Sequence, residues 1–293
     1  MIRIVLITCF LQFMPAQTKK DFGELKLSID SIIVTHKGTF AVSFKDISTG
    51  VRVDINAHEY FHAASTMKTP VMIEVFNQAK QNKFALNDSI PVVNSFKSII
   101  DGTEYSLQLS DDSEDGLYNR IGKLETIRNL VVKMITVSSN LSTNILIEKV
   151  GPENVMRTLA TMGLKDIQVL RGVEDGKAYD AGKNNTTTSF DLSIIYESIA
   201  LKKCISKQAS EEMLEILLSQ KFKDMIPAKL PPPVKVAHKT GSITNVQHDS
   251  GIIFLPDGRS YILVVLSKNL ASNKEGIEAI SSISKRIYDF MME

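Results

Sequence analysis

Two predicted strand pairs, one near each end of the chain, constrain the fold more than any other feature. Thr39–Ser48 alternates apolar and polar residues, and a Thr-Gly pair joins it to Val51–Ala57, as in a β-hairpin. Near the other end, residues 250–256 and 259–268 flank a Pro-Asp-Gly-Arg turn, which is a strong hairpin signal. Strands from the two ends can share one sheet only if the chain between them leaves the sheet and returns to it.

The section between these strand pairs is predicted to be helical. From Pro70 to about Ser219, several segments carry apolar residues three and four positions apart, which is the spacing of amphipathic helices. Asp88 and Ser189 are predicted to be helix N-caps, because a short polar side chain there can accept the free N–H groups of a first helical turn. This section is long enough to form a lobe of its own.

The economical fold is α/β of the α+β kind, with one antiparallel sheet built from both chain ends, helices on its faces and an inserted all-helical lobe. Outer helices are expected over residues 22–36 and 273–292. We expect a sheet lobe over about residues 20–68 and 222–293 and a helical lobe over about residues 69–221. A cleft between the two lobes is the expected active site.

The first sixteen residues have the pattern of a secretory signal peptide. A short basic start precedes the apolar run Ile4–Met14, which is too short to span a bilayer, and small residues follow it. We expect cleavage near Ala16 or Gln17, one mature domain over residues 17–293 and a periplasmic or secreted protein. A buried N-terminal helix is the alternative. No later stretch is long and apolar enough to suggest a membrane span.

Composition narrows the function further. The mature chain would keep one cysteine, Cys204, which excludes an internal disulfide. Cys204 ends an amphipathic segment with no partner nearby in sequence, so we expect a core or surface thiol and not a nucleophile. Acidic and basic residues are mixed and the net charge is +1, which gives no electrostatic footprint for nucleic acid. We expect a monomer.

A serine and a lysine, Ser65 and Lys68, stand at the start of the helical section. Residues three apart share a helix face, and a desolvated lysine can accept a proton from a serine hydroxyl. Pro70 supports a helix start just before it, so the N–H of Ser65 could form half of an oxyanion hole. A second Ser-x-x-Lys, Ser282–Lys285, lies in an ordinary amphipathic helix, so a solvated surface pair is the alternative.

A different motif overlaps this region. His58 and His62 belong to a His-Glu-x-x-His pattern, which on a helix would place two imidazoles on one face to bind zinc. The helical context is absent, however, because a strand is expected to end at about Asn56 and Pro70 limits how early the next helix can begin. A loop with two polar histidines is the favoured interpretation, and a zinc peptidase remains a remote alternative.

Two later segments carry polar groups that could join the same site. Ser138–Asn144 follows an apolar run and opens a predicted helix, on which Asn140 and Asn144 would share a face. Capping of that helix by the serine and asparagine side chains is the alternative.

The second of these segments, His238–Ser242, lies on a predicted strand. Lys239 supplies a charge and Thr240 a hydroxyl that can bind a carboxylate, and Gly241 removes a side chain so that a ligand can lie along the strand edge. An edge strand with a glycine bulge is the alternative.

Two polar segments are weaker candidates. Asp111–Gly116 has the first half of a calcium loop, but its twelfth position is Gly122 where a bidentate glutamate is needed. A solvated acidic loop is the favoured interpretation. Gly172–Ser189 is a long, polar, glycine-bearing loop, and loops of that length are usually functional or disordered.

The order of these motifs carries more information than any one of them. Ser-x-x-Lys, a Ser-x-Asn at a helix start and a Lys-Thr-Gly on a late strand form the set found in class A β-lactamases and penicillin-binding proteins. The chain resembles class A β-lactamases over nearly its whole mature length, including "SSNLSTN", "VGPENVMRTLATMGL" and "NTTTSFDL". The predicted layout of strands and helices is also that of the family.

The resemblance implies roles in an acylation step. Ser65 would be the acylated nucleophile, Lys68 its proton acceptor, directly or through a water molecule, and Ser138 the group that passes the proton to the leaving amide nitrogen. The N–H groups of Ser65 and Ser242 would form the oxyanion hole. No metal and no other cofactor is implied.

The resemblance also implies the substrate contacts. Asn140 would hold the acylamino side chain of the substrate, and Lys239 and Thr240 its carboxylate, beside Gly241 and Ser242 on the strand edge. The partner would be a β-lactam or a D-alanyl peptide.

Deacylation is where the chain departs from the family. The family carries its water-activating carboxylate two residues after an arginine, whereas here Glu174 stands three residues after Arg171. Glu174 is the predicted base, Asp175 the alternative, and Asn144 the predicted hydrogen-bond partner of the base. The arginine of the family usually pairs with an aspartate where this chain has Asn185.

A second departure is an insertion of about a dozen residues between the first two motifs, around residues 95–116, which could reshape or cap the cleft. The implied function is a serine β-lactamase that works through a Ser65 acyl-enzyme. The alternative is a penicillin-binding peptidase or esterase that β-lactams acylate but that turns them over poorly.

Overall fold

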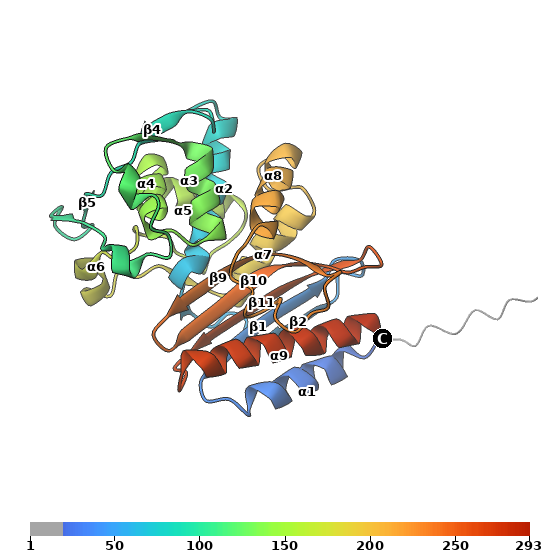
Figure 1. Cartoon of the computed structure of the whole chain (residues 1–293). Coiled ribbons are helices and arrows are strands. Elements are labelled where there is room, and N and C mark those ends of the chain that lie inside the picture. Colours follow the sequence, from blue (N-terminus) through green and yellow to red (C-terminus); the bar gives the residue numbers. More distant parts are fainter. Residues whose placement is uncertain (1–19) are drawn as a thin grey trace, which may run out of the picture.

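The computed structural model describes residues 20–293, so the predicted signal peptide lies outside the described residues. Figure 1 shows a twisted sheet with two long helices on one face and a group of helices beyond the other. Among residues 20–293, no helix combines the length and the apolar composition that crossing a bilayer requires.

The central sheet confirms the predicted fold class. It has five antiparallel strands in the order β2-β1-β11-β10-β9, so the two ends of the chain meet where β1 pairs with β11. Both predicted hairpins are present, and the register places Val42 opposite Val265. The strands are β1 (Thr39–Asp46), β2 (Arg52–Ile55), β9 (Lys235–Ile243), β10 (Val246–Phe254) and β11 (Ser260–Lys268).

Two terminal helices, α1 (Phe22–Ile33) and α9 (Asn273–Met292), cover one face of the sheet (Figure 1). Their apolar stripes pack on the alternate residues of the strands that point to that face, in a core that includes Leu25 of α1 and Ile283 of α9. Each helix begins at a side-chain cap, Asp21 for α1 and Ser272 for α9, which satisfies N–H groups of the first turn.

The other face of the sheet carries the helical section. Helix α7 lies directly on strands β1, β10 and β11, although the sequence assigns it to the helical lobe. The helices of this section are α2 (Lys68–Lys80), α3 (Ile127–Thr136), α4 (Asn140–Val150), α5 (Pro152–Thr161), α6 (Gly176–Asp180), α7 (Ser189–Ala200) and α8 (Lys207–Leu218).

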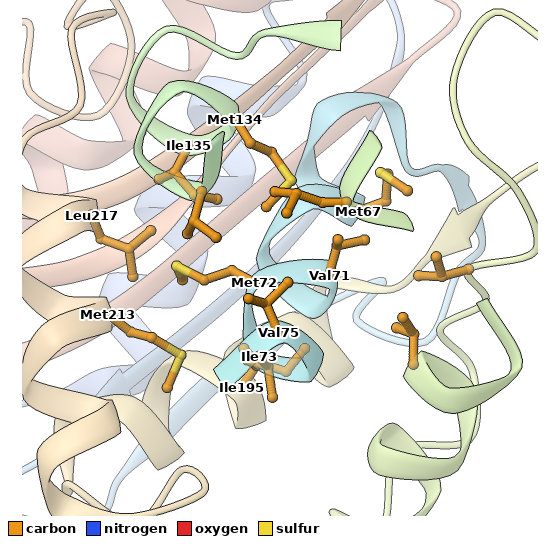
Figure 2. Packing of buried hydrophobic residues seen from close by; sticks show 14 of the residues in the cluster. Met67, Val71, Met72, Ile73, Val75, Met134, Ile135, Ile195, Met213 and Leu217 are labelled. Atoms are coloured by element: carbon orange, nitrogen blue, oxygen red, sulfur yellow. The ribbon is translucent and has the colours of Figure 1, made fainter. Parts of the chain in front are cut away.

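Helix α2 is the centre of this section, and a short 3₁₀ turn, Ala64–Met67, leads into it. Residues on nearly every side of α2 are buried, so its sequence lacks the polar face of a surface helix. Figure 2 shows Met72 and Val75 of α2 among apolar side chains from α3, α7 and α8, such as Met134 and Leu217. This packing fixes where α2 begins and therefore where Ser65 and Lys68 lie.

Short strand pairs connect the helices. They are β3 (Phe61–His62) with β8 (Thr186–Thr187), β4 (Ser89–Pro91) with β7 (Leu124–Thr126), and β5 (Phe96–Lys97) with β6 (Glu104–Tyr105).

Both predicted N-caps need correction. Asp88 precedes strand β4, not a helix, and its carboxylate accepts the N–H of Ala85 in a turn. Thr188, one residue before Ser189, caps α7. Cys204 is buried, and burial raises the pKa of its thiol to about 11, which fits the predicted core thiol.

Candidate functional site

Ser65 lies on the 3₁₀ turn that leads into α2, at the meeting point of two adjoining cavities. The cavities have volumes of about 410 and 400 Å³ and share Ser65, Asn140, Glu174 and Ser242 in their walls. One extends toward the Gly172–Ser189 loop and the other toward the start of α9. The structure therefore places four of the predicted site residues around one cleft.

Lys68 is fully buried beside Ser65 and makes three hydrogen bonds to the segment before α4. Its Nζ donates to the carbonyl of Ser138 at 2.6 Å, to the Ser138 hydroxyl at 3.1 Å and to Oδ1 of Asn140 at 2.8 Å. Burial lowers the pKa of Lys68 to about 7, although the carboxylates of Asp112 and Glu174 oppose the shift. Near neutral pH a substantial fraction of this amine can accept a proton.

The second predicted lysine, Lys239, reaches Ser138 from strand β9. Its Nζ donates to the Ser138 hydroxyl at 3.0 Å and to the carbonyl of Thr240 at 2.8 Å. Burial, and then the nearby charge of Lys68, lowers the pKa of Lys239 well below its usual value. Because the Nζ atoms of Lys68 and Lys239 both donate to the Ser138 oxygen, its O–H hydrogen is free to point into the cleft.

The backbone at Ser138 is also unusual. Its φ is +58°, which places a residue with a side chain in the left-handed region. Ser139, the next residue, caps α4 by accepting the N–H of Ser142 at 3.2 Å. The predicted helix start therefore holds, with the cap on Ser139 and the Ser138 side chain directed to the two lysines.

Strand β9 approaches the nucleophile closely because residue 241 is glycine. A Cβ atom at Gly241 would lie 3.2 Å from the backbone nitrogen of Ser65 and 3.2 Å from Cγ2 of Thr66. Such a contact is tighter than ordinary packing, so a side chain here would push the strand away from the Ser65 N–H. Thr240 and Ser242 flank this glycine and line the cleft.

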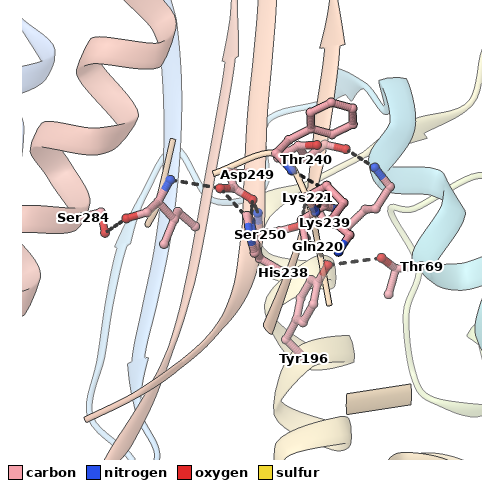
Figure 3. A network of polar contacts seen from close by, with 12 residues as sticks. Thr69, Tyr196, Gln220, Lys221, His238, Lys239, Thr240, Asp249, Ser250 and Ser284 are labelled. Atoms are coloured by element: carbon pink, nitrogen blue, oxygen red, sulfur yellow. Dashed lines mark hydrogen bonds and ion pairs between the residues drawn. The ribbon is translucent and has the colours of Figure 1, made fainter. Parts of the chain in front are cut away.

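A buried polar network behind Lys239 joins β9 to the helices (Figure 3). The Tyr196 hydroxyl of α7 lies 3.1 Å from Oγ1 of Thr69 and 3.1 Å from the Ser250 hydroxyl, which is 3.2 Å from the Lys239 carbonyl. Tyr196 thus ties the residue after Lys68 to the strand that carries Lys239. Nothing in the sequence distinguishes this tyrosine, which stands in an amphipathic helix like any core aromatic.

Asn144 does not bind Glu174, so that prediction is wrong. Its side chain accepts the N–H of Val173 at 2.7 Å and donates to the Val173 carbonyl at 2.9 Å. Val173 occupies the position, two residues after Arg171, where the family spacing expects the carboxylate. Asn144 is buried beneath the loop and serves as its anchor.

Glu174, the next residue, faces the cleft from this anchored loop. Its φ is +59°, and its side chain is exposed to both cavities. Partial desolvation raises the pKa of Glu174, and the carboxylate of Asp111 raises it further, against the opposite effect of Arg171 and Lys68. The carboxylate is therefore placed to accept a proton in the cleft that holds Ser65.

Asp175, the alternative base, is engaged elsewhere. Its oxygens accept the Ser98 hydroxyl at 2.9 Å, the Ile99 N–H at 3.0 Å and the Ala178 N–H at 3.1 Å. It caps α6 and fastens the loop to the β5–β6 hairpin of the insertion. Because its oxygens are occupied and its side chain is buried, we assign it a structural role.

We therefore expect Asp175→Asn to lower the unfolding free energy. The rate of β-lactam hydrolysis, the reaction that the family resemblance implies, should stay within about threefold of wild type. An asparagine keeps one acceptor oxygen, but its amide N–H₂ group would face donors that the second carboxylate oxygen now accepts. This mismatch costs about 1–3 kcal/mol of unfolding free energy. Urea denaturation and steady-state kinetics would measure the two effects. An unchanged stability with a large loss of turnover would return Asp175 to the list of candidate bases.

Arg171 and Asn185 hold the loop through backbone contacts. The Arg171 guanidinium donates to the carbonyls of Lys183 and Gly172 and to Oδ1 of Asn184 at 2.9–3.0 Å. Asn185 pairs with the Arg171 backbone, accepting its N–H at 3.2 Å and donating to its carbonyl at 2.9 Å. Where the family usually has an ion pair with an aspartate, the Arg171 guanidinium here binds uncharged acceptors.

The insertion around residues 95–116 forms one wall of the site. The Tyr105 hydroxyl lies 3.3 Å from the Val173 carbonyl, and the Asp111 carbonyl accepts Nδ2 of Asn140 at 2.6 Å. The carboxylate of Asp112 accepts the N–H of Leu141 at 2.8 Å, at the start of α4. The acidic segment predicted to be solvated thus supports the helix that carries Asn140.

The zinc motif is not on a helix. Phe61–His62 forms strand β3, and His58 lies in the turn before it, next to Asp166. Within residues 20–293, no group of three or more histidine, cysteine or acidic side chains is placed to hold a metal ion. The two histidines therefore lack the shared helix face that the zinc hypothesis requires.

Comparisons with known proteins identify the family and the fold. The sequence model of the beta-lactamase enzyme family matches residues 24–291. The extended-spectrum beta-lactamase PER-1 of Pseudomonas aeruginosa is 25% identical over 295 residues, which cover 96% of this chain and 92% of PER-1. The solved beta-lactamase of Sphaerobacter thermophilus is 25% identical with a TM-score of 0.79, over 93% of this chain and 99% of that one. The structure of PBP-A, 21% identical with a TM-score of 0.78 over 92% and 96%, shares the fold.

Proposed function

The chain belongs to the beta-lactamase enzyme family, and from this premise we propose that it is a class A serine β-lactamase acting through a Ser65 acyl-enzyme. The observation that carries the proposal is the meeting of Lys68 and Lys239 on the Ser138 hydroxyl, in the cleft that Ser65 lines. In this arrangement Lys68 can accept a proton, the Ser138 hydroxyl can donate one, and Lys239 can carry a positive charge when a substrate anion lies beside it.

Acylation follows from these contacts. The neutral amine of Lys68 takes the proton of the Ser65 hydroxyl, whose oxygen attacks the lactam carbonyl carbon. The N–H of Ser65 stabilises the negative charge on the carbonyl oxygen, and Gly241 leaves the space for that oxygen. The carbon–nitrogen bond then breaks, and the nitrogen receives the Ser138 proton, which the ammonium of Lys68 replaces.

The substrate carboxylate would lie beside the Thr240 hydroxyl and the Lys239 amine, and its negative charge would favour the protonated form of Lys239. Asn140 is held by Lys68 on its oxygen and by the Asp111 carbonyl on its nitrogen. Its amide orientation is therefore fixed, and we propose that it contacts the acylamino side chain after exchanging one of these bonds.

Deacylation would use Glu174. Its carboxylate takes a proton from water as the water oxygen attacks the ester carbon. The Ser65 oxygen then leaves and receives this proton from Glu174, so Glu174, Lys68 and Ser138 all return to their starting protonation states. The spacing of the loop favours a second function, because Val173 stands where the family carries its water-activating carboxylate and Glu174 comes one residue later. Glu174 would then be unable to activate the water. In that case β-lactams would acylate Ser65 but remain bound, as in a penicillin-binding peptidase or esterase.

Intact-protein mass spectrometry over time separates these functions. With benzylpenicillin, the wild type is expected to form an adduct that clears, and peptide mapping would place it on Ser65. Glu174→Gln, which cannot accept the proton, is expected to clear its adduct at least about 100-fold more slowly. A wild-type adduct that persists would favour the penicillin-binding function, and equal clearance by both proteins would exclude Glu174 as the base.

We also propose that the mature enzyme acts outside the cytoplasm, since the predicted signal peptide would export it. We further propose that it acts as a monomer.

A further inference from the structure

His62, three residues before Ser65, has no part in the roles assigned above, yet its ring contacts the turn that holds the nucleophile. Its Nδ1 lies 3.0 Å from the backbone nitrogen of Ala64 and accepts that N–H. A side-chain acceptor bound to the N–H two residues later closes the same small turn that asparagine and aspartate form. The proton of a neutral His62 must then be on Nε2.

The turn that this bond closes is not one that alanine adopts readily. Ala64 has a φ of +44°, in the left-handed region where a Cβ crowds the backbone. Its neighbours are held as well, because Ala63 donates its N–H to the Asn185 carbonyl at 2.9 Å and Thr66 donates to the Ala63 carbonyl at 3.0 Å. The next residue in the chain is Ser65, so the position of its hydroxyl and N–H depends on this turn.

The backbone and the ring of His62 are both held by contacts from other elements. Its carbonyl accepts Nε2 of His248 at 2.9 Å, and its ring meets the Tyr179 ring edge-on with centroids 6.4 Å apart. The side chain also lines the larger cavity of the site. The imidazole of His62 therefore lies between the turn before Ser65 and the space that a substrate would occupy.

We propose that neutral His62 is a positioning residue, which holds the Ala64 turn and through it Ser65, and that protonation of its ring releases this turn. The inference rests on the proposed function, in which Ser65 is the nucleophile. An imidazolium carries an N–H on both nitrogens. Its Nδ1–H would face the N–H of Ala64, and two donors cannot share the bond.

The surroundings of His62 support a neutral ring near neutral pH. Burial lowers the pKa of His62, and the Arg171 guanidinium lowers it further. Strand β8, which pairs with β3, brings only the uncharged Thr186 and Thr187. The charged or titratable groups on the other elements around it are Arg171, Glu174, Asp175, Tyr179, His248 and Lys268.

Two substitutions separate the acceptor from the titration. His62→Asn keeps an oxygen that can accept the Ala64 N–H and does not titrate, whereas His62→Ala removes the acceptor. We expect His62→Ala to slow adduct formation on Ser65 by about 10- to 100-fold at pH 7.5. His62→Asn is expected to stay within about threefold of wild type. His58→Asn, in the exposed turn before β3, is the matched control and should change nothing.

The pH profile provides a readout that a purely structural role would not change. Lys68 must be neutral in both proteins, which gives the logarithm of the acylation rate a slope of about one per pH unit in acid. Protonation of His62 should slow the wild type by about a further 10- to 100-fold, so over one to two pH units its profile should be steeper, with a slope approaching two, than that of His62→Asn. Adduct formation avoids the titration of Glu174, which acts later. Equal slopes in the two proteins, or an Asn variant as slow as the Ala variant, would overturn the proposal.

Nitrogen-15 NMR of the histidine rings tests the same point without substrate. The His62 signals, assigned by their loss in His62→Asn, are expected to show a proton on Nε2 and a bare Nδ1 at pH 7.5, and to titrate below pH 6.5. A proton on Nδ1 would overturn the inference even if the enzyme hydrolyses β-lactams. If no β-lactam acylates the wild type while the NMR result holds, the proposed function fails and the His62 turn stands.

Discussion

Replacing Ser65 with alanine is expected to abolish the covalent β-lactam adduct and to lower hydrolysis of benzylpenicillin by at least about 10⁴-fold. Ser65 lines both cavities of the site, and Ser138, whose hydroxyl Lys68 binds, lines one of them. Without the hydroxyl, these groups have no nucleophile to activate. Intact-mass measurement and steady-state kinetics would record both losses.

The chain supplies its own control for this experiment. Ser282 begins the second Ser-x-x-Lys, on α9, where its hydroxyl lies 2.9 Å from the Lys229 amine. Ser282→Ala should hydrolyse benzylpenicillin at the wild-type rate to within about twofold. If Ser65→Ala retained an adduct of the same mass, Ser65 would not be the nucleophile.

The second large effect is expected from Lys68→Met. Methionine fills a similar volume but cannot accept a proton, so acylation should slow by about 10³- to 10⁴-fold. The variant also leaves the Ser138 carbonyl and Oδ1 of Asn140 without their donor. The rate of adduct formation, measured by rapid quenching and mass spectrometry, reports this step directly. Lys285→Met, in the exposed pair with Asp289 on α9, is the matched control and should leave the rate unchanged.

The pH dependence of the same rate identifies Lys68 as the base. Burial lowers the pKa of Lys68 to about 7 in the folded protein, from about 10.5 in the unfolded chain. Since only the neutral amine accepts a proton, wild-type acylation should rise with pH through about 7 and then level off. This rise should be absent from the residual rate of Lys68→Met. An unchanged profile in the variant would assign the rise to another group.

The same shift affects stability, with a sign that can be worked out. Between pH 7 and 10.5 the unfolded chain holds a proton on Lys68 that the folded protein lacks, so unfolding takes up a proton. The unfolding free energy of the wild type, relative to Lys68→Met, should therefore increase with pH across this window and decline as pH falls toward 7. Denaturant titrations at several pH values would measure the difference.

Much of the fold could be predicted because it depends on local patterns. The two hairpins, the terminal helices and the helical section all follow from the spacing of apolar residues and from turn chemistry. Asp88 was misassigned because a polar residue before a short apolar run is compatible with a helix or a strand. The run became strand β4 because β7, which lies far along the sequence, was available to pair with it.

For the site, the sequence predicted which residues gather but not all of their contacts. The motif order identified Ser65, Lys68, Ser138 and the strand at Lys239, and these do surround one cleft. The contacts of the Gly172–Ser189 loop were not predictable, since Asn144 could be matched to Glu174 by the family pattern but binds Val173 in this chain. A loop one residue out of register moves every side chain on it, and spacing alone cannot say which backbone group is anchored.

The sequence by itself determined which residues form strands and helices and which residue types could carry the chemistry, because periodicity and motif spacing are local properties. Only the tertiary structure decided that Lys68 and Lys239 bind the same Ser138 oxygen and that His62 accepts the Ala64 N–H. The physical reason is burial: packing α2 against α4, and the Ala64–Met67 turn against β9, removes water from the two amines. Desolvation then lowers their pKa values, and no stretch of sequence contains that information on its own.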